Sequence, residues 1–358
     1  MAPHQPRVIN IFKKIFHRLE FEWLGFKTKI QNLPRRIRLE KSFRQNTANL
    51  RRLKKTLSPA QSITGIFLTE HFGDIIACEP VIRHTRARFP KDIIVWFTYE
   101  PFIQLLEHHP DLKQVFPVTC ITECKMLMES CLIDRVVDLH IGPRPCHWFG
   151  TFHYKNKSET DVTVFNHYSH GTILEAFSKA AGLGFLSDAP RVYTPPAVRD
   201  SVVGIAPHEP FLVIHAASNV AARDWKDEKW KLLVERITKK YPISIVEVGL
   251  KSRVARQVPG VLDLCGKLSL LQLGELIRRA SGFVGIDSGP AHFANAFKCP
   301  SVILLGHYLN YKRYMPYNGF LRENAQEMLL YWDGPARDIP VDVVEEKIFK
   351  ILKIQSMN

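Results

Sequence analysis

The stretch GFVGIDSGPAHFANAFKCPSVILLG, residues 282–306, places polar side chains where a helix is expected to begin. Asp287 and Ser288 follow the apolar run FVGI, Gly289 comes next with a proline behind it, and His292 lies about one turn further. The first turn of a helix carries backbone N–H groups without intrahelical partners, and it favours a bound anion. The stretch therefore predicts a strand, an anion-binding turn, a helix and a second strand. The alternative is an ordinary Asp or Ser helix cap with a histidine satisfied in the core.

A second polar turn of the same kind occurs near the start of the chain. In GIFLTEHFGDII, Gly73 and Asp74 follow an apolar run and open an apolar, helix-like segment. Ligands of open parallel sheets bind beyond the carboxyl ends of the strands. Two such turns therefore predict one cleft, with polar groups supplied from both sides.

Two series of alternating strands and helices must position these turns. The first series has expected strands at 63–69, 93–98 and 135–140 and expected helices at 75–89, 100–108 and 172–182. The second has expected strands at 211–218, 243–248, 261–265 and 283–286, expected helices at 227–239 and 269–280, and a last helix begun by Pro340. Ser269 is the expected N-cap of the helix at 269–280. This alternation predicts two parallel α/β domains, 61–200 and 201–358, with their boundary near the proline-containing stretch 194–200.

Charge is concentrated at the N-terminus. The chain has 358 residues, a hydrophobic fraction of 46% and a net charge of +14, which is typical of a globular protein with a basic excess. Residues 1–60 hold fifteen Lys and Arg against three Glu, a net charge of +12, and the rest of the chain holds only +2. An acidic partner is therefore expected to bind residues 1–60.

The segment 8–26 repeats large apolar residues at helical spacing, with Lys13, Lys14 and Arg18 beside the stripe. Such a helix can lie on an anionic membrane surface, or it can pack on the protein's own body. Nucleic acid is a third possible partner, disfavoured because no nucleic-acid-binding signature follows the basic arm.

The cysteines give no sign of a disulfide framework. They number seven and have no CxxC spacing, which favours a reducing compartment and free thiols over a metal site built from Cys120, Cys124, Cys131, Cys146 and His147. We found no apolar run long enough to span a membrane. The expected location is cytoplasmic, or peripheral on the cytosolic face of a membrane.

Four stretches resemble glycosyltransferase family 9, the lipopolysaccharide core heptosyltransferases. They are LTEHFGDIIACEPVIRHTRARFP, VVDLHIGPR, FLVIHAASNVAARDWKDEKWKLL and GIDSGPAHFANAFKCPSVILLG, and the resemblance covers roughly residues 63–310. The last stretch is the most specific match. The resemblance implies a GT-B fold: two Rossmann-like parallel-sheet domains facing a cleft, here preceded by a basic helical N-terminal segment. It also implies inverting transfer of a heptose from ADP-heptose to the Kdo/heptose inner core, without a metal ion or cofactor.

The resemblance assigns roles to particular residues. Asp74 would be the general base that takes the acceptor's proton. The donor-binding residues would be Ser218, Arg223, Lys226, Asp287, Ser288, Gly289 and His292, in which Arg223 pairs with phosphate, Asp287 holds sugar hydroxyls and His292 braces the turn. The acceptor-binding residues would be Glu70, His71, Gly73 and Arg144. By their charge, Arg144, Lys155, Lys157, His167 and His170 could meet phosphate or Kdo carboxylate of an acidic glycolipid, and the alternative, a solvated basic loop, is the favoured interpretation. The partner would be an acidic lipid-linked saccharide in the inner leaflet of the inner membrane.

Several positions depart from the family's pattern. Glu70 and His71 stand where serines are common, and we expect an acid so close to Asp74 to raise its pKa or to reshape acceptor contacts. Arg223 replaces the usual lysine, and the ribose-binding segment reads VGLKSR, with Lys251 and Arg253 in place of an acid. A catalytically silent or donor-altered relative that binds a nucleotide sugar at the membrane is therefore the alternative function.

Overall fold

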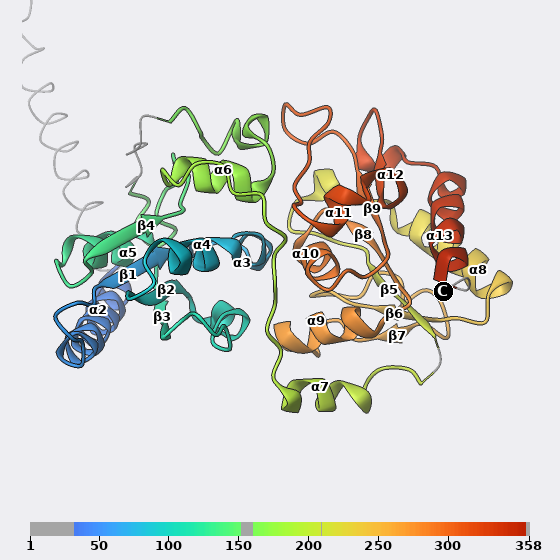
Figure 1. The fold of residues 1–358 in the computed structure, drawn as a ribbon. Coiled ribbons are helices and arrows are strands. Elements are labelled where there is room, and N and C mark those ends of the chain that lie inside the picture. Colours follow the sequence, from blue (N-terminus) through green and yellow to red (C-terminus); the bar gives the residue numbers. More distant parts are fainter. Residues whose placement is uncertain (1–31, 152–159, 209, 356–358) are drawn as a thin grey trace, which may run out of the picture.

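The computed structural model describes residues 32–151, 160–208 and 210–355. Two sheets lie side by side in it, and every pairing between their strands is parallel (Figure 1). The first sheet has the strand order β3-β2-β1-β4, and the second has the order β10-β9-β8-β5-β6-β7. The predicted α/β class with two parallel-sheet domains is confirmed.

The first sheet is covered on both faces. Its strands are β1 (Ile63–Phe67), β2 (Ile93–Tyr99), β3 (Gln114–Val118) and β4 (Arg135–Asp138). Helices α2 (Leu33–Lys55) and α5 (Ile121–Glu129) pack on one face through a core that includes Leu50 and Phe97. Helices α3 (Phe72–Ala77), α4 (Pro80–Arg88) and α6 (Ile173–Ala180) pack on the other face. This double cover explains why the strands read as apolar runs rather than as alternating patterns.

Some predicted elements of this half were wrong in detail. The single helix expected over 75–89 is two helices, because Pro80 has no backbone N–H with which to continue α3. The segment expected as a helix over 100–108 is the 3₁₀ helix η1 (Glu100–Leu105). Strand β3 and helix α5 were not predicted from the sequence.

The second sheet contains β5 (Phe211–His215), β6 (Ser244–Glu247), β7 (Leu262–Asp263), β8 (Gly282–Ile286), β9 (Ser301–Leu305) and β10 (Leu329–Tyr331). Helices α8 (Asp227–Lys240) and α13 (Val341–Gln355) pack on one face, and α9 (Leu270–Arg279) and α10 (Gly289–Ala296) pack on the other. Ser269 caps α9 in a capping box with Gln272, as predicted. The edge strand β10 was not predicted.

Short elements connect the halves and border the site. They are η2 (His167–His170), α7 (Pro196–Val203), η3 (Ala221–Arg223), α11 (Phe320–Glu323), α12 (Ala325–Met328) and η4 (Ala336–Asp338). One extended segment runs between the two halves from α6 to α7, and α7 packs on α9 (Figure 1). The boundary near 194–200 remains a prediction.

Part of the basic N-terminal segment is the helix α2. Nine exposed Lys and Arg and one Glu lie on it, while Leu39 and Leu50 are buried against the first domain. This portion therefore packs on the protein's own body. The helix predicted over 8–26, with Lys13, Lys14 and Arg18, lies outside the described residues. Within the described residues, no helix has the length and apolar character of a membrane span.

Candidate functional site

The two polar turns predicted from the sequence meet where α3 packs on α10. A Cβ added to Gly73 would lie 2.8 Å from Cδ2 of His292 and 3.2 Å from Cα of Gly289. A Cβ added to Gly289 would lie 2.0 Å from the ring of Phe72. The close approach of the two helices therefore depends on glycine at both positions. Gly73 is buried in this contact and serves helix packing, and its predicted role in acceptor binding stays a prediction.

Asp74 lies in the first turn of α3, at the junction of the two halves. Burial raises the pKa of its carboxyl to about 6, His71 and Arg223 oppose the rise, and Asp287 adds to it. His71, which precedes this turn, adopts a φ of 27°, a conformation that is uncommon for a residue other than glycine. A carboxyl with a pKa near neutrality, set in a turn between two domains, has the protonation behaviour that a general base requires.

Glu70 is not the cause of this raised pKa, contrary to our expectation. It forms an ion pair with Arg144, which follows β4 in the chain. The causes of the Asp74 shift are its burial and its charged neighbours His71, Arg223 and Asp287. The predicted acceptor residues Glu70 and Arg144 thus pair with each other beside the turn, while His71 is exposed next to Asp74.

Arg223 and Asp287 form the charged centre of the second half. Nη1 of Arg223 lies 3.2 Å from Oδ2 of Asp287, and its guanidinium stacks 3.7 Å from the ring centroid of Tyr308. Nε of Arg223 is buried and has no hydrogen-bond partner among the described residues. A buried guanidinium N–H without a partner is costly unless a ligand accepts its hydrogen bond.

The carboxylate of Asp287 is already engaged by protein groups. Tyr317 donates a hydrogen bond of 2.8 Å to its Oδ1, and Tyr314 donates one of 3.1 Å to its Oδ2. With the Arg223 ion pair, this makes three protein partners for one buried carboxylate. The arrangement positions Arg223, and the prediction that Asp287 holds sugar hydroxyls stays a prediction.

The N-terminus of α10 has no side-chain cap. Ser288 occupies the N-cap position with an extended backbone, but its side chain makes no capping hydrogen bond. In the described residues, no hydrogen bond from the Gly289 N–H is found. The capping alternative that the sequence left open for Ser288 is therefore wrong, and the dipole of the helix faces the junction uncapped.

His292 lies one turn into α10 and is buried. Burial lowers the pKa of its imidazole to about 4, so the ring is neutral at pH 7. Its ring centroid lies 4.9 Å from that of Tyr317, and Nδ1 has no partner in the described part of the chain. These contacts and its approach to Gly73 are those of a side chain that braces the turn.

The other two predicted donor residues lie in the segment that carries Arg223. The Ser218 hydroxyl bonds to Asp224 at 2.9 Å and to the carbonyl of Val220 at 2.9 Å, so it is used to hold that turn. Lys226 is exposed at the N-cap position of α8. Neither side chain contacts Asp287 directly in the interactions found for the described residues.

In the first half, η2 borders the same junction. Burial lowers the pKa of His167 to about 4, and its neighbours include Arg144, Arg223 and Asp287. His170 lies against Lys179, with 3.0 Å between Nδ1 and Nζ. Lys155 and Lys157 lie outside the described residues.

Sequence reasoning missed a group of tyrosines that lines the junction. Tyr308, Tyr311, Tyr314 and Tyr317 come from one segment of the second half, and Tyr168 comes from η2 of the first. Tyr311 joins the halves, since its hydroxyl donates to the carbonyl of Phe165 at 3.0 Å and accepts from the N–H of Tyr168 at 3.2 Å. The tyrosine-rich run HYLNYKRYMPY was the available signal.

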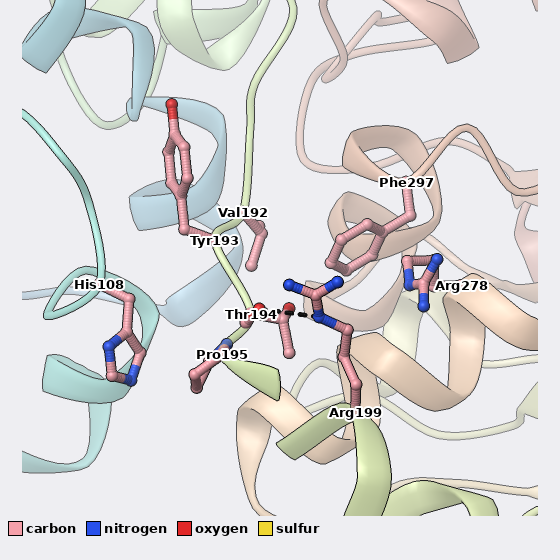
Figure 2. Close-up of a pocket in the computed structure, with 8 residues that line it drawn as sticks. All are labelled: His108, Val192, Tyr193, Thr194, Pro195, Arg199, Arg278 and Phe297. Atoms are coloured by element: carbon pink, nitrogen blue, oxygen red, sulfur yellow. Dashed lines mark hydrogen bonds between the residues drawn. The ribbon is translucent and has the colours of Figure 1, made fainter. Parts of the chain in front are cut away.

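A separate pocket of about 440 Å³ opens elsewhere between the halves (Figure 2). Its lining comprises His108, Val192, Tyr193, Thr194, Pro195, Arg199, Arg278 and Phe297. Arg199 donates from Nε to the Thr194 carbonyl at 3.1 Å, and Arg278 pairs with Glu275. No predicted site residue lines this pocket, so it is distinct from the junction of α3 and α10.

The cysteines do not form a metal centre in the described part of the chain. Cys120, Cys124 and Cys146 are buried free thiols, and Cys131 is exposed. Across residues 32–151, 160–208 and 210–355, no group of three or more His, Cys, Asp or Glu side chains is arranged to hold a metal ion.

Residues 194–324 match glycosyltransferase family 9 (heptosyltransferase). Two curated proteins named lipopolysaccharide heptosyltransferase 3 are similar in sequence. One, from Escherichia coli, is 26% identical over 139 residues, which make up 36% of this chain and 38% of the relative's length. The other, from Escherichia coli strain K12, is 18% identical over 309 residues, 75% of this chain and 88% of the relative.

Solved structures share the fold. A family 9 glycosyl transferase from Veillonella parvula DSM 2008 superposes with a TM-score of 0.62 at 16% identity, over 82% of this chain and 97% of that one. ADP-heptose LPS heptosyltransferase II of E. coli gives a TM-score of 0.61 at 17% identity, over 82% and 99%. E. coli heptosyltransferase WaaC with ADP-2-deoxy-2-fluoro heptose gives a TM-score of 0.51 at 16% identity, over 80% of this chain and 99% of that one. The expected GT-B fold is thereby confirmed.

The family match lies over the half that holds Arg223, Asp287 and the open end of α10, and both heptosyltransferase relatives and the shared two-domain fold agree with it. Over residues 194–324, the chain is therefore similar to the glycosyltransferases of family 9.

Proposed function

We propose that this protein transfers a heptose from ADP-heptose to the Kdo/heptose inner core of lipopolysaccharide, with inversion at the anomeric carbon. The observation that carries the proposal is the meeting of Asp74 with Arg223 and the uncapped end of α10 at one junction. The first half supplies a base, Asp74, and the second half supplies positive charge through Arg223 and the helix end. The names of two structural neighbours, an ADP-heptose LPS heptosyltransferase and WaaC with an ADP-heptose analogue, support the choice of donor.

Asp74 acts on the acceptor. Its carboxylate takes the proton of an acceptor hydroxyl while that oxygen forms a bond to the anomeric carbon of the donor. The bond from the anomeric carbon to the diphosphate oxygen breaks at the same time, and ADP leaves with the bonding electrons. Attack on the face opposite the leaving group inverts the anomeric configuration, so one carboxylate on the attacking side suffices.

Arg223 and α10 act on the leaving group. The diphosphate gains negative charge as the bond breaks, and Nε of Arg223 and the N–H groups at Ser288 and Gly289 are the donors available to it. Asp287 and the tyrosines hold Arg223 in place, Ser218 holds its turn, and Lys226 adds positive charge at the entrance. The proposal includes no metal ion, because these groups supply the positive charge that the leaving group needs.

The acceptor lies against the first half. His71 lies near Asp74 in the chain and its charge acts on that carboxyl, and Glu70, just before this turn, forms an ion pair with Arg144. A histidine near the base and an arginine near the turn suit an acceptor that carries carboxylate or phosphate groups, as a Kdo-bearing lipid does.

Donor turnover tests the proposal. Purified protein is incubated with ADP-heptose and a Kdo-bearing lipid A acceptor, and ADP release is followed for the wild type and Asp74→Ala. We expect release by the wild type, none by the variant, and ADP binding by both. Asp200→Ala, which removes an exposed carboxylate from α7, is the matched control and should keep full turnover.

Full turnover by Asp74→Ala would reject the base assignment. A folded wild type that releases no ADP with several acceptors would direct the test to a panel of other nucleotide sugars. Absence of turnover with every donor, despite nucleotide binding, would favour the catalytically silent relative, which the family comparisons do not favour.

The proposal extends to a peripheral location on the cytosolic face of the inner membrane, through residues 1–60. The described part of that segment, α2, exposes nine Lys and Arg, and near its start Leu33 and Ile37 are 53% and 59% exposed. Basic side chains around exposed aliphatic ones suit an anionic lipid surface. This face belongs to the half that holds the acceptor residues, so docking there would bring that half to the membrane in which a lipid-linked acceptor lies.

Vesicle sedimentation tests this location. We expect binding to phosphatidylglycerol vesicles that weakens with salt, little binding to phosphatidylcholine vesicles, and a loss in the double variant Arg36→Glu/Lys41→Glu. The control reverses two exposed lysines on other surfaces, Lys91→Glu/Lys239→Glu. Equal binding of both double variants would place the contact elsewhere, and binding to nucleic acid instead of vesicles would reject the membrane as partner.

A further inference from the structure

Side chains join the ends of β1 and β4 beside the turn that carries Asp74. The two strands are parallel neighbours in which Phe67 faces Asp138, so Thr69 and His140, each two residues further along, come together beyond the strand ends. Thr69 is fully buried, and only 7% of His140 is exposed. The contact between them therefore links the start of the turn to a different strand of the sheet.

His140 bonds in both directions. Its Nδ1 lies 2.8 Å from Oδ1 of Asp138, and its Nε2 accepts a hydrogen bond of 3.2 Å from the Thr69 N–H and lies 2.9 Å from the Thr69 hydroxyl. Because a backbone N–H can only donate, Nε2 carries no proton and the Nδ1–H donates to Asp138. The same carboxylate oxygen accepts the backbone N–H of His140 at 3.1 Å, so Asp138 fixes the orientation of the ring.

The turn that follows Thr69 contains a strained residue. His71 has a φ of 27°, and a residue other than glycine keeps such a conformation only when its surroundings hold it there. On the C-terminal side of the turn, α3 packs on α10. On the N-terminal side, the hold comes from the bond of Thr69 to His140 and from the ion pair of Glu70 with Arg144.

We propose that His140 is a positioning residue for the base: by joining Thr69 to Asp138, it holds the strained turn and keeps the Asp74 carboxyl in its buried place at the junction. This inference rests on the proposed function for the role of Asp74. Without the bridge, the turn is free to relax, and the carboxyl gains contact with water.

The burial of the Asp74 carboxyl can be followed through its titration. Burial is the first cause of its pKa of about 6, so a turn that admits water lowers this pKa. Its charged neighbours are His71 in the same turn and Arg223 and Asp287 across the junction, and none of them is altered when His140 is replaced. The other titratable or charged groups around the turn are Glu70 with Arg144, Cys78, Tyr168 and His292. A lower pKa of Asp74 in a His140 variant therefore reports a change in the turn.

Three substitutions of His140 separate hydrogen bonding from packing. His140→Leu removes both bonds, His140→Asn keeps a donor near the position of Nδ1 but leaves the Thr69 N–H without its partner, and His140→Gln keeps an acceptor near the position of Nε2. His109→Leu is the matched control. His109 is a buried histidine of the same half, with the Glu79 carboxylate 2.9 Å from its Nε2 and the Asp111 N–H bonded to its Nδ1.

We expect kcat/KM above pH 7 to fall about 10-fold to 100-fold in His140→Leu and His140→Asn, because a misplaced catalytic group has effects of this size. The acid limb of the pH profile should move to lower pH in both variants, and ADP binding should stay unchanged. His140→Gln should keep most of the turnover and the acid limb of the wild type. His109→Leu should lower the melting temperature as His140→Leu does, while its acid limb stays in place.

Titration of ligand-free protein labelled with ¹³C at the aspartate carboxyls gives a readout that needs neither donor nor acceptor. The Asp74 signal is identified by its absence in Asp74→Asn. We expect a midpoint of about 6 in the wild type, His140→Gln and His109→Leu, and a lower midpoint in His140→Leu and His140→Asn.

An unchanged midpoint in His140→Asn, or a His140→Gln variant that behaves like His140→Asn, would overturn the inference, and this comparison holds even if His140→Leu does not fold. The expected midpoints in a protein that releases no ADP would reject the proposed function and leave the positioning role of His140 in place.

Discussion

At the scale of single residues, the carboxyl of Asp74 is the most informative group in the chain. Its pKa of about 6 results mainly from burial, and Arg223 holds it below the value that burial and Asp287 would otherwise set. The base is therefore mostly ionised at pH 7 but not far above its titration point. This behaviour makes the protonation state of one residue visible in the kinetics.

We predict that kcat/KM increases with pH through about 6 and then levels, because the base must be ionised to accept the acceptor's proton. Arg223→Gln should move this acid limb to higher pH as well as lowering the rate, since Arg223 opposes the raised pKa of Asp74. Initial rates from pH 5 to 8 measure both. An acid limb that stays in place in Arg223→Gln would show that another group titrates.

Gly73 is the second residue whose role is clear from geometry. Gly73→Ala should lower the melting temperature and the turnover, because the new methyl would lie 2.8 Å from the His292 ring and 3.2 Å from Cα of Gly289. Overpacking of this kind costs about 1–3 kcal/mol. Gly204→Ala is the control, since a Cβ there meets nothing within 4 Å. Equal melting temperatures for the two variants would mean that α3 and α10 are not in close contact in solution.

At the scale of elements, the segment from His307 to Tyr317 is a third wall of the site. It supplies Tyr308 beneath Arg223, and it crosses to the first half through Tyr311. Helices α3 and α10 carry the predicted groups, but this loop and η2 close the junction around them. The relative position of the halves thus depends on loop contacts as well as on helix packing.

Tyr311→Phe should weaken that closure. The hydroxyl of Tyr311 bonds both the Phe165 carbonyl and the Tyr168 N–H. Because one of these bonds is exposed and the other only part-buried, each contributes about 0.5–1.5 kcal/mol, the net value of an ordinary hydrogen bond. We expect a lower melting temperature and a higher KM for the acceptor. Tyr241→Phe is the matched control, because the buried Tyr241 hydroxyl has no partner among the described residues, so its removal should be neutral or stabilising. The same losses in both variants would argue against a specific role for Tyr311.

At the scale of the whole molecule, buried neutral histidines link stability to pH. His167, His215 and His292 each have a pKa lowered to about 4, with burial as the first cause. The unfolded chain binds protons to histidine near pH 6.5, so between about 6.5 and 4 the unfolded state takes up more protons than the folded state. The stability contributed by these three residues is therefore present at neutral pH and is lost as the pH falls. Asp74, with its raised pKa, acts in the opposite direction below about pH 6.

We predict that the melting temperature falls between pH 7 and pH 5, since three histidines outweigh one carboxyl. Differential scanning fluorimetry at matched ionic strength measures it. In Asp74→Asn the opposing contribution is absent, so its melting temperature should fall more steeply over the same range. A melting temperature that is constant from pH 7 to pH 5 would contradict the neutral, buried state of these histidines.

The sequence by itself determined the local units of this protein. Apolar runs, glycine turns and helical spacing identified the strands and helices around Asp74 and Asp287, because those patterns depend on neighbouring residues. The capping box at Ser269 was visible for the same reason. The short strands β3 and β10 were not, since each has few residues and its pairing partner lies far along the chain.

Only the tertiary structure decided how the side chains pair. Arg223 meets Asp287 across 64 positions, Ser288 meets His215 across 73, and Tyr311 meets Phe165 across 146. The rise in the pKa of Asp74 that we expected from Glu70 was wrong, and the alternative of a Ser288 cap was wrong as well. Partners distant in sequence, Arg144 and His215, engage those two side chains. Local sequence pattern indicates which polar groups lie at the ends of the strands. Hydrogen bonds and burial between distant segments determine the partners and the protonation state of each group.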